Sequence, residues 1–161
     1  MIFTGHSINV STAYSVFAGL PLDDVFEAHL SHKAFLERLD SPFVLNNYLD
    51  TYEIFLQLTG TEKGAAESLQ TRWNDREVRL RAIEDENLQL GVFIHYAKRC
   101  MIMFFFGNYQ QCYDAACKAR PLEEYAMGTL YVAQLYFYWC LSAAMLHETG
   151  TPAEKKRYAG V

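Results

Sequence analysis

Turn-forming residues are scarce in this chain of 161 residues. Four prolines and nine glycines are too few for the many turns of an all-β fold, and no alternation of apolar and polar residues is long enough to predict a strand. Hydrophobic residues nevertheless make up 51% of the chain and charged residues 20%, a composition that argues against intrinsic disorder. We therefore expect a single all-α domain, residues 1–161, large enough to bury one core.

Positive charge is also in short supply. The net charge is −5, the 14 lysines and arginines are scattered, and the densest basic cluster is the short KKR at 155–157. Because binding to nucleic acid needs a basic stripe that neutralises phosphates, we expect no nucleic-acid partner. The first residues, MIFTGHSINV, lack the charged and apolar regions of a secretory signal, and four cysteines without a secretory context indicate a reducing compartment. The cytoplasm is the expected location.

The stretch from Tyr125 to Leu146 has no charged residue and is long enough to cross a bilayer. Thr129, Gln134 and Ser142 interrupt it, and its aromatic rings are spread along the run, whereas a membrane span gathers them at its two ends. A helix surrounded by other helices also reads as apolar on every side. We therefore predict a buried helix here and no membrane partner.

Sequence motifs for catalysis or cofactor binding are absent. The chain has no G-x-S-x-G nucleophile elbow, no phosphate-binding loop and no spaced-glycine dinucleotide motif. His29 and His32 are three residues apart, but two imidazoles need further ligands that the sequence does not place nearby. We predict no catalytic residue, no metal site and no cofactor.

The four cysteines do not form a recognisable motif either, since no C-x-x-C pair occurs. Cys112 and Cys117 are five residues apart, so on a helix they point about 140° from each other and cannot easily share a metal or a disulfide. Cys100 and Cys140 lie within apolar stripes, where a free thiol usually acts as a small core residue. Buried, structural cysteines are the expectation.

A helical period runs along most of the chain. Gly19 ends one predicted helix and Pro21 opens the next, Ser41 and Pro42 repeat that start signal, and Gly60 ends the third helix. The second helix turns five apolar side chains inward: Val25, Phe26, Leu30, Leu36 and Leu39. The pattern predicts antiparallel helix pairs joined by short loops.

The predicted segments follow in order along the chain. The first hairpins occupy about 7–58, with helices over 7–18, 21–39 and 42–59. A polar connector covers 60–87 with short helices around 62–70 and 75–84. A second set of helices spans 88–148, with breaks at Gly107 and Pro121 and a long last helix over 124–147. A frayed tail follows at 149–161.

The stretch FFFGNYQQCYDAACKA is the densest in suggestive residues, and it is predicted to be an elbow between two helices. Gly107 can take the left-handed cap conformation, Asn108 tolerates a tight turn, and Tyr109 can fold back on the preceding phenylalanines. Ala115 and Ala116 are small enough to let the second helix approach closely. Tetratricopeptide-type hairpins pack in this way, although no strict 34-residue period is present.

Four segments taken in order, YSVFAGLPLDDV, YLDTYEIFLQLTG, ENLQLGVFIHYAKRCMIMFFFGNYQQCYDAACKA and GTLYVAQLYFYWCLSAAML, resemble one kind of region. The chain is similar to the tetratricopeptide-like helical region that follows the AAA-type ATPase domain in multidomain serine/threonine and sensor histidine kinases. This resemblance implies an α-solenoid fragment that acts as a non-catalytic interaction or scaffolding module in signal transduction, with a protein partner. No Walker motif, phospho-accepting histidine box or kinase catalytic loop lies in the chain, so neither ATPase nor kinase activity carries over.

Aromatic side chains left at the rim of such a module would make its contacts, although each ring could equally fill the core. The candidates are Tyr109, Tyr113 and Tyr125. An alternative function is a small-molecule sensor, because an aromatic-rich interior between helices can hold an apolar ligand. That alternative expects a pocket of several hundred cubic ångströms lined by Phe104, Tyr131 and Tyr138.

Overall fold

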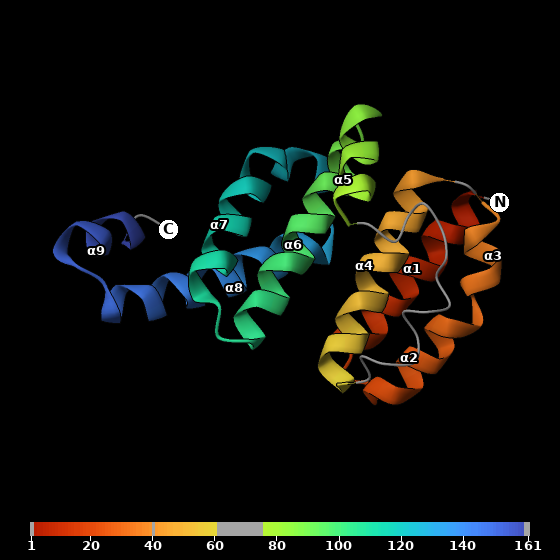
Figure 1. The fold of residues 1–161 in the computed structure, drawn as a ribbon, viewed down its shortest axis with the longest axis horizontal. Coiled ribbons are helices and arrows are strands. Elements are labelled where there is room, and N and C mark those ends of the chain that lie inside the picture. The colour runs from red at the N-terminus through yellow and green to blue at the C-terminus, as the bar shows by residue number, and fades with distance from the viewer. Residues whose placement is uncertain (1, 40, 61–75, 160–161) are drawn as a thin grey trace. The chain divides into compact units, whose positions relative to one another are not determined.

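A computed structural model describes residues 2–39, 41–60 and 76–159 of the chain (Figure 1). These residues form helices, turns and loops without a strand, so the all-α prediction is confirmed for this part of the chain. The chain folds into two compact units, residues 1–88 and 89–161, and each is described by itself. That the whole chain forms one domain stays a prediction.

The first unit is built around one central helix. Its described elements are α1 (Ile2–Phe17), α2 (Leu22–Ser31), α3 (Lys33–Glu37), α4 (Pro42–Thr59) and α5 (Arg76–Asp85). Helix α4 packs against the other four, and Val44, Tyr48 and Tyr52 form its core together with Leu36 of α3. The bounds of α4 match the prediction, because Pro42 stands at its start and Gly60 ends it in the left-handed conformation (φ 69°).

The imidazole of His29 belongs to this core. Its ring has no exposed surface and stacks on Tyr48 with centroids 4.1 Å apart, and its Nε2 lies 3.2 Å from the Tyr48 carbonyl oxygen. The neighbouring His32 is exposed and stands at the break between α2 and α3. The two imidazoles therefore do not act together.

Two details of the first unit differ from the prediction. The helix expected over 21–39 is interrupted at His32, so α2 and α3 are separate helices, and this break turns Leu36 fully into the core while Leu30 stays 37% exposed. Helix α1 begins at Ile2, five residues earlier than predicted. Gly5 lies in this added turn, where a Cβ would stand 2.7 Å from the Leu39 Cδ1 and 2.8 Å from the Val44 Cγ1. The missing side chain at Gly5 therefore lets α1 lie close to the core.

The connector predicted over 60–87 is described only in its second half. Helix α5 confirms the short helix expected at 75–84, whereas the helix expected at 62–70 lies outside the described residues. Arg79 ties α5 to α4: its Nη2 lies 3.3 Å from the Asp50 Oδ1 and also contacts the Glu53 carboxylate. Asn46 donates from Nδ2 to the Asp50 Oδ2 over 3.2 Å. A charged group thus holds two helices together inside the unit.

The second unit is a helical hairpin with a third helix laid against it. Its elements are α6 (Gln89–Phe105), α7 (Tyr109–Ala119), the 3-10 helix η2 (Arg120–Ala126), α8 (Leu130–Thr149) and α9 (Pro152–Tyr158). Helix α7 runs back along α6, and α8 packs against both (Figure 1). Helix α8 starts six residues later than predicted, because η2 and a left-handed Gly128 (φ 82°) occupy the intervening chain.

The tail is more ordered than the predicted fraying of residues 149–161. Helix α9 starts with a capping box, in which Glu154 N–H donates to the Thr151 hydroxyl and the Glu154 carboxylate accepts from Thr151 N–H. Tyr158 is buried at its end, and its hydroxyl donates to the Gln110 Oε1 over 2.8 Å. The T-x-x-E pattern and a docked tyrosine therefore hold this segment on α7 and α8.

No helix in the described ranges is both long and apolar enough to cross a membrane.

Candidate interaction surface

The elbow between α6 and α7 is set by its backbone. Gly107 has φ 72°, its N–H donates to the Phe104 carbonyl (3.0 Å), and the Asn108 N–H donates to the Met103 carbonyl (2.8 Å). These two bonds form a Schellman motif, which closes a helix with a left-handed residue that is usually glycine. The Tyr109 ring lies 5.5 Å from the Phe104 ring. The predicted cap and the folded-back tyrosine are therefore confirmed.

Helix α7 turns small side chains toward its neighbours. Ala115 and Ala116 are buried, the second completely. A helix pair can pack at short range where alanines replace larger side chains. This is the arrangement that the sequence predicts for the helix after the elbow.

Aromatic rings remain exposed beside this elbow. Phe105 and Phe106 at the end of α6 are 53% and 51% exposed, and Phe137 of α8 is 59% exposed. The half-buried Tyr138 connects the two helices, since its ring lies 5.4 Å from that of Phe105 and 5.1 Å from that of Phe137. Burial raises the pKa of Tyr138, which keeps its hydroxyl neutral. We call Phe105, Phe106, Phe137 and Tyr138 the elbow patch.

The three tyrosines predicted as contact residues have different surroundings. Tyr125 on η2 is exposed and Tyr109 is partly buried. Tyr113 is only 5% exposed, because its ring packs edge-on against Trp139 at 6.1 Å and Tyr158 at 5.0 Å. Tyr113 therefore fills the interior of the second unit and is not available as a rim contact.

The sequence-based selection of contact residues missed the elbow patch. The sequence signal for the elbow patch is the FFF run directly before Gly107. Three consecutive side chains at the end of a helix point in different directions, so they cannot all be buried against its neighbours. Phe104 is the ring that turns inward, with its centroid 5.4 Å from that of Tyr138.

The cysteines also separate into two kinds. Cys100 and Cys112 are buried with their sulfurs 3.2 Å apart, whereas Cys117 and Cys140 are exposed. The expected divergence of Cys112 and Cys117 around α7 is confirmed, but the expectation of buried cysteines is wrong for Cys117 and Cys140, which are both exposed. Helix α8 has an apolar outer face, and Cys140 lies on that face.

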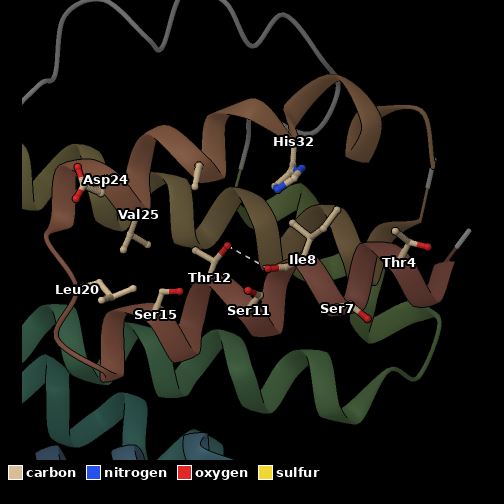
Figure 2. Close-up of a pocket in the computed structure, with 11 residues that line it drawn as sticks. Thr4, Ser7, Ile8, Ser11, Thr12, Ser15, Leu20, Asp24, Val25 and His32 are labelled. Atoms are coloured by element: carbon tan, nitrogen blue, oxygen red, sulfur yellow. Dashed lines mark hydrogen bonds between the residues drawn. The ribbon is translucent and has the colours of Figure 1, made fainter.

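A pocket of about 350 Å³ lies in the first unit, between α1 and α2 (Figure 2). Figure 2 shows hydroxyls of α1 along one side and residues of α2 along the other. The lining residues are Thr4, Ser7, Ile8, Ser11, Thr12, Ser15, Leu20, Asp24, Val25, Ala28 and His32. Phe104 and Tyr138, named for the predicted aromatic pocket, instead pack ring against ring.

Neither metal ligands nor known proteins indicate an activity. Within residues 2–39, 41–60 and 76–159, no group of three or more histidine, cysteine, aspartate and glutamate side chains could hold a metal ion. Helix pairs of this kind occur in proteins of unrelated function, so the fold alone specifies none. Comparison of the chain with protein-family models, with curated proteins and with solved structures finds no match.

Proposed function

We propose that this chain is a non-catalytic helical-repeat module that makes protein–protein contacts in a cytoplasmic signal-transduction kinase. The observation that supports this proposal is the elbow patch. Phe105 and Phe137, each more than half exposed, both contact the Tyr138 ring, and the equally exposed Phe106 follows Phe105 in the chain. Clustered exposed rings mark interaction sites, because aromatic side chains are enriched in the cores of protein interfaces.

A tetratricopeptide-like stack is the finer fold that we propose. The α6–α7 hairpin has the short elbow and the small buried residues of such a repeat. Helix α8, which follows it, leaves four large apolar side chains partly exposed: Leu130, Phe137, Leu141 and Met145. In a solenoid, each repeat buries its apolar faces against its neighbours, so an outer face of this composition suits a helix that another element covers.

The proposed partner is a protein surface with exposed apolar side chains, either another domain of the same signalling kinase or a separate protein. The chain's negative net charge and scattered basic residues favour neither nucleic acid nor an anionic membrane. The link to kinases rests on the sequence resemblance, and the elbow patch supports the interaction role.

The experiment first determines the coding sequence on either side of this chain; each kinase, ATPase or sensor domain found there is then purified and titrated with the chain by isothermal titration calorimetry. Phe137→Ser and Phe106→Ser each remove one exposed ring of the elbow patch. Phe3→Ser is the matched control, since Phe3 is an exposed ring on α1. We expect each patch variant to weaken binding about tenfold or more, while the control binds as the unchanged chain does.

Two results would contradict this function. One is the absence of binding to every flanking domain, and the other is equal affinity for the patch variants and for Phe3→Ser. Circular dichroism of each variant confirms that helix content is retained, so that a loss of binding is not a loss of fold.

A second candidate function, small-molecule sensing, is favoured by the pocket between α1 and α2. Its volume of about 350 Å³ suits a small ligand, and its lining combines apolar side chains with hydroxyls. Ala28→Trp would fill the pocket, while Ala34→Trp adds the same ring to an exposed position outside it. A ligand that raises the melting temperature of the Ala34 variant but not of the Ala28 variant would support this function; a library in which every ligand acts equally on both variants would exclude it for this pocket.

A further inference from the structure

Two buried thiols face each other across the α6–α7 hairpin. The Sγ atoms of Cys100 and Cys112 are 3.2 Å apart, and neither side chain has exposed surface. Cys100 lies two helical turns before Gly107 and Cys112 lies just over one turn after it, so the elbow itself aligns them. A disulfide needs sulfurs at about 2.05 Å, so the two sulfurs would have to approach by little more than 1 Å.

We propose that Cys100 and Cys112 are an oxidation site, at which a disulfide clamps α7 onto α6. The two residues come from helices joined by a three-residue turn, so the bond would link elements that already lie together. No change of fold is needed, because both thiols are buried and already in contact with each other.

The surroundings distinguish the two sulfurs. A hydrogen bond from the Cys100 thiol lowers the pKa of Cys112, and the same bond, together with burial, raises the pKa of Cys100. The Cys112 thiol donates to the Tyr138 carbonyl oxygen over 3.6 Å, a weak bond that is lost when this thiol ionises. We assign Cys112, whose pKa is the lowered one, as the sulfur that reacts with the oxidant, and Cys100 as the thiol that resolves the product.

Hydrogen peroxide is the oxidant that fits this site, because it is about the size of water and can enter when the end of the hairpin opens locally. The Cys112 thiolate attacks one peroxide oxygen, the O–O bond breaks, and hydroxide leaves to form a sulfenic acid at Cys112. The Cys100 sulfur then displaces the sulfenic hydroxyl, which leaves as water with the Cys100 proton. The balance is two thiols and one peroxide giving one disulfide and two waters.

The test uses the full chain with Cys117→Ser and Cys140→Ser, which removes both exposed thiols and keeps the buried pair. After hydrogen peroxide treatment we expect an intact mass lower by about 2 Da, from the loss of two hydrogens, and a peptide that links Cys100 to Cys112. The disulfide closes a loop of about 12 residues, which should lower the ratio of unfolded to folded protein roughly 100-fold. This change is measured as a higher urea midpoint of the oxidised protein, which returns to its original value when dithiothreitol reduces the bond.

Adding Cys100→Ser to this background is expected to stop the reaction at a sulfenic acid on Cys112, which dimedone traps, with no loss of 2 Da. Two thiols that stay free after peroxide, or a sulfinic acid at Cys112 without a cross-link, would overturn the site. A lower urea midpoint after oxidation would overturn the clamp. If the added substitution prevents folding, the cross-linked peptide from the background protein still decides the question.

Discussion

Replacing Gly5 with alanine has two opposing effects on the free energy of unfolding, one from helix propensity and one from packing. Alanine is a better helix former than glycine, by about 1 kcal/mol in a helix interior. A Cβ at this position would, however, lie 2.7 Å from the Leu39 Cδ1, 2.8 Å from the Val44 Cγ1 and 3.3 Å from the Leu36 Cδ2. The first two of these distances are shorter than real Cβ atoms tolerate.

The packing cost is expected to exceed the gain in helix propensity. The tip of Leu39 can move, because that side chain is half-buried, but Val44 is fully buried and its branched side chain has one preferred rotamer in a helix. Overpacking of a filled core costs about 1–3 kcal/mol. We therefore expect Gly5→Ala to destabilise the first unit by about 1 kcal/mol, and Gly5→Leu by about 3 kcal/mol, since its branches must fit into the same space.

Urea unfolding followed by circular dichroism at 222 nm measures both changes. Ser11→Ala is the matched control, because Ser11 is exposed on the same helix and alanine there gains only helix propensity, up to about 0.5 kcal/mol. The two alanine substitutions should therefore shift the midpoint in opposite directions. If Gly5→Ala raised the stability by about 1 kcal/mol, α1 would not lie against Val44 and Leu39, and the account of this helix contact would be wrong.

Three further predictions concern other parts of the chain. Arg79→Met should destabilise the first unit by about 3 kcal/mol in urea unfolding, because it takes a cation from beside the buried Asp50 carboxylate; a loss below about 0.5 kcal/mol, the size of a surface ion pair, would contradict a structural role. Gly107→Ala should cost about 1 kcal/mol, since the position is left-handed (φ 72°) but has no atom within 4 Å of an added Cβ; a much larger cost would mean that the elbow is crowded. Hydrogen bonds from the Thr151 hydroxyl and backbone hold the pKa of Glu154 below its ordinary value of 4.5, so the contribution of the carboxylate to α9 is present above that pH and is lost as the pH falls through the lowered value. Amide protection factors of α9 should drop on acidification in the unchanged chain and stay level in Glu154→Gln, and equal acid dependence in both would refute this cap.

Local signals predicted the elements whose ends carry specific residues. The bounds of α4 follow from Pro42 at its first position and the left-handed Gly60 after it, and the elbow follows from Gly107. Start and stop signals of this kind act within a few residues, so they can be read without knowing what the helix packs against. The T-x-x-E start of α9 is a signal of the same kind, so the expectation of a frayed tail is wrong for Pro152–Tyr158.

Packing between helices could not be predicted in the same way. The period of an apolar stripe shows that a face is buried, but it does not show which neighbour covers it. Tyr113 and Phe105 have similar rings and lie on either side of the elbow, yet the first is covered by Trp139 and Tyr158 and the second is exposed. The break at His32 likewise depends on how Leu36 meets α4.

The amino-acid sequence by itself determined that this chain is helical, where its clearest helices end and that the FFFGNY stretch is an elbow. These properties depend on backbone geometry, composition and periodicity, which act over one or two helical turns. Only the tertiary structure decided that Cys100 meets Cys112, that Gly5 marks a close contact, and that Phe105 of α6 meets Tyr138 of α8. Each of these joins residues of different helices, whose distances depend on packing across the unit and not on the local chain.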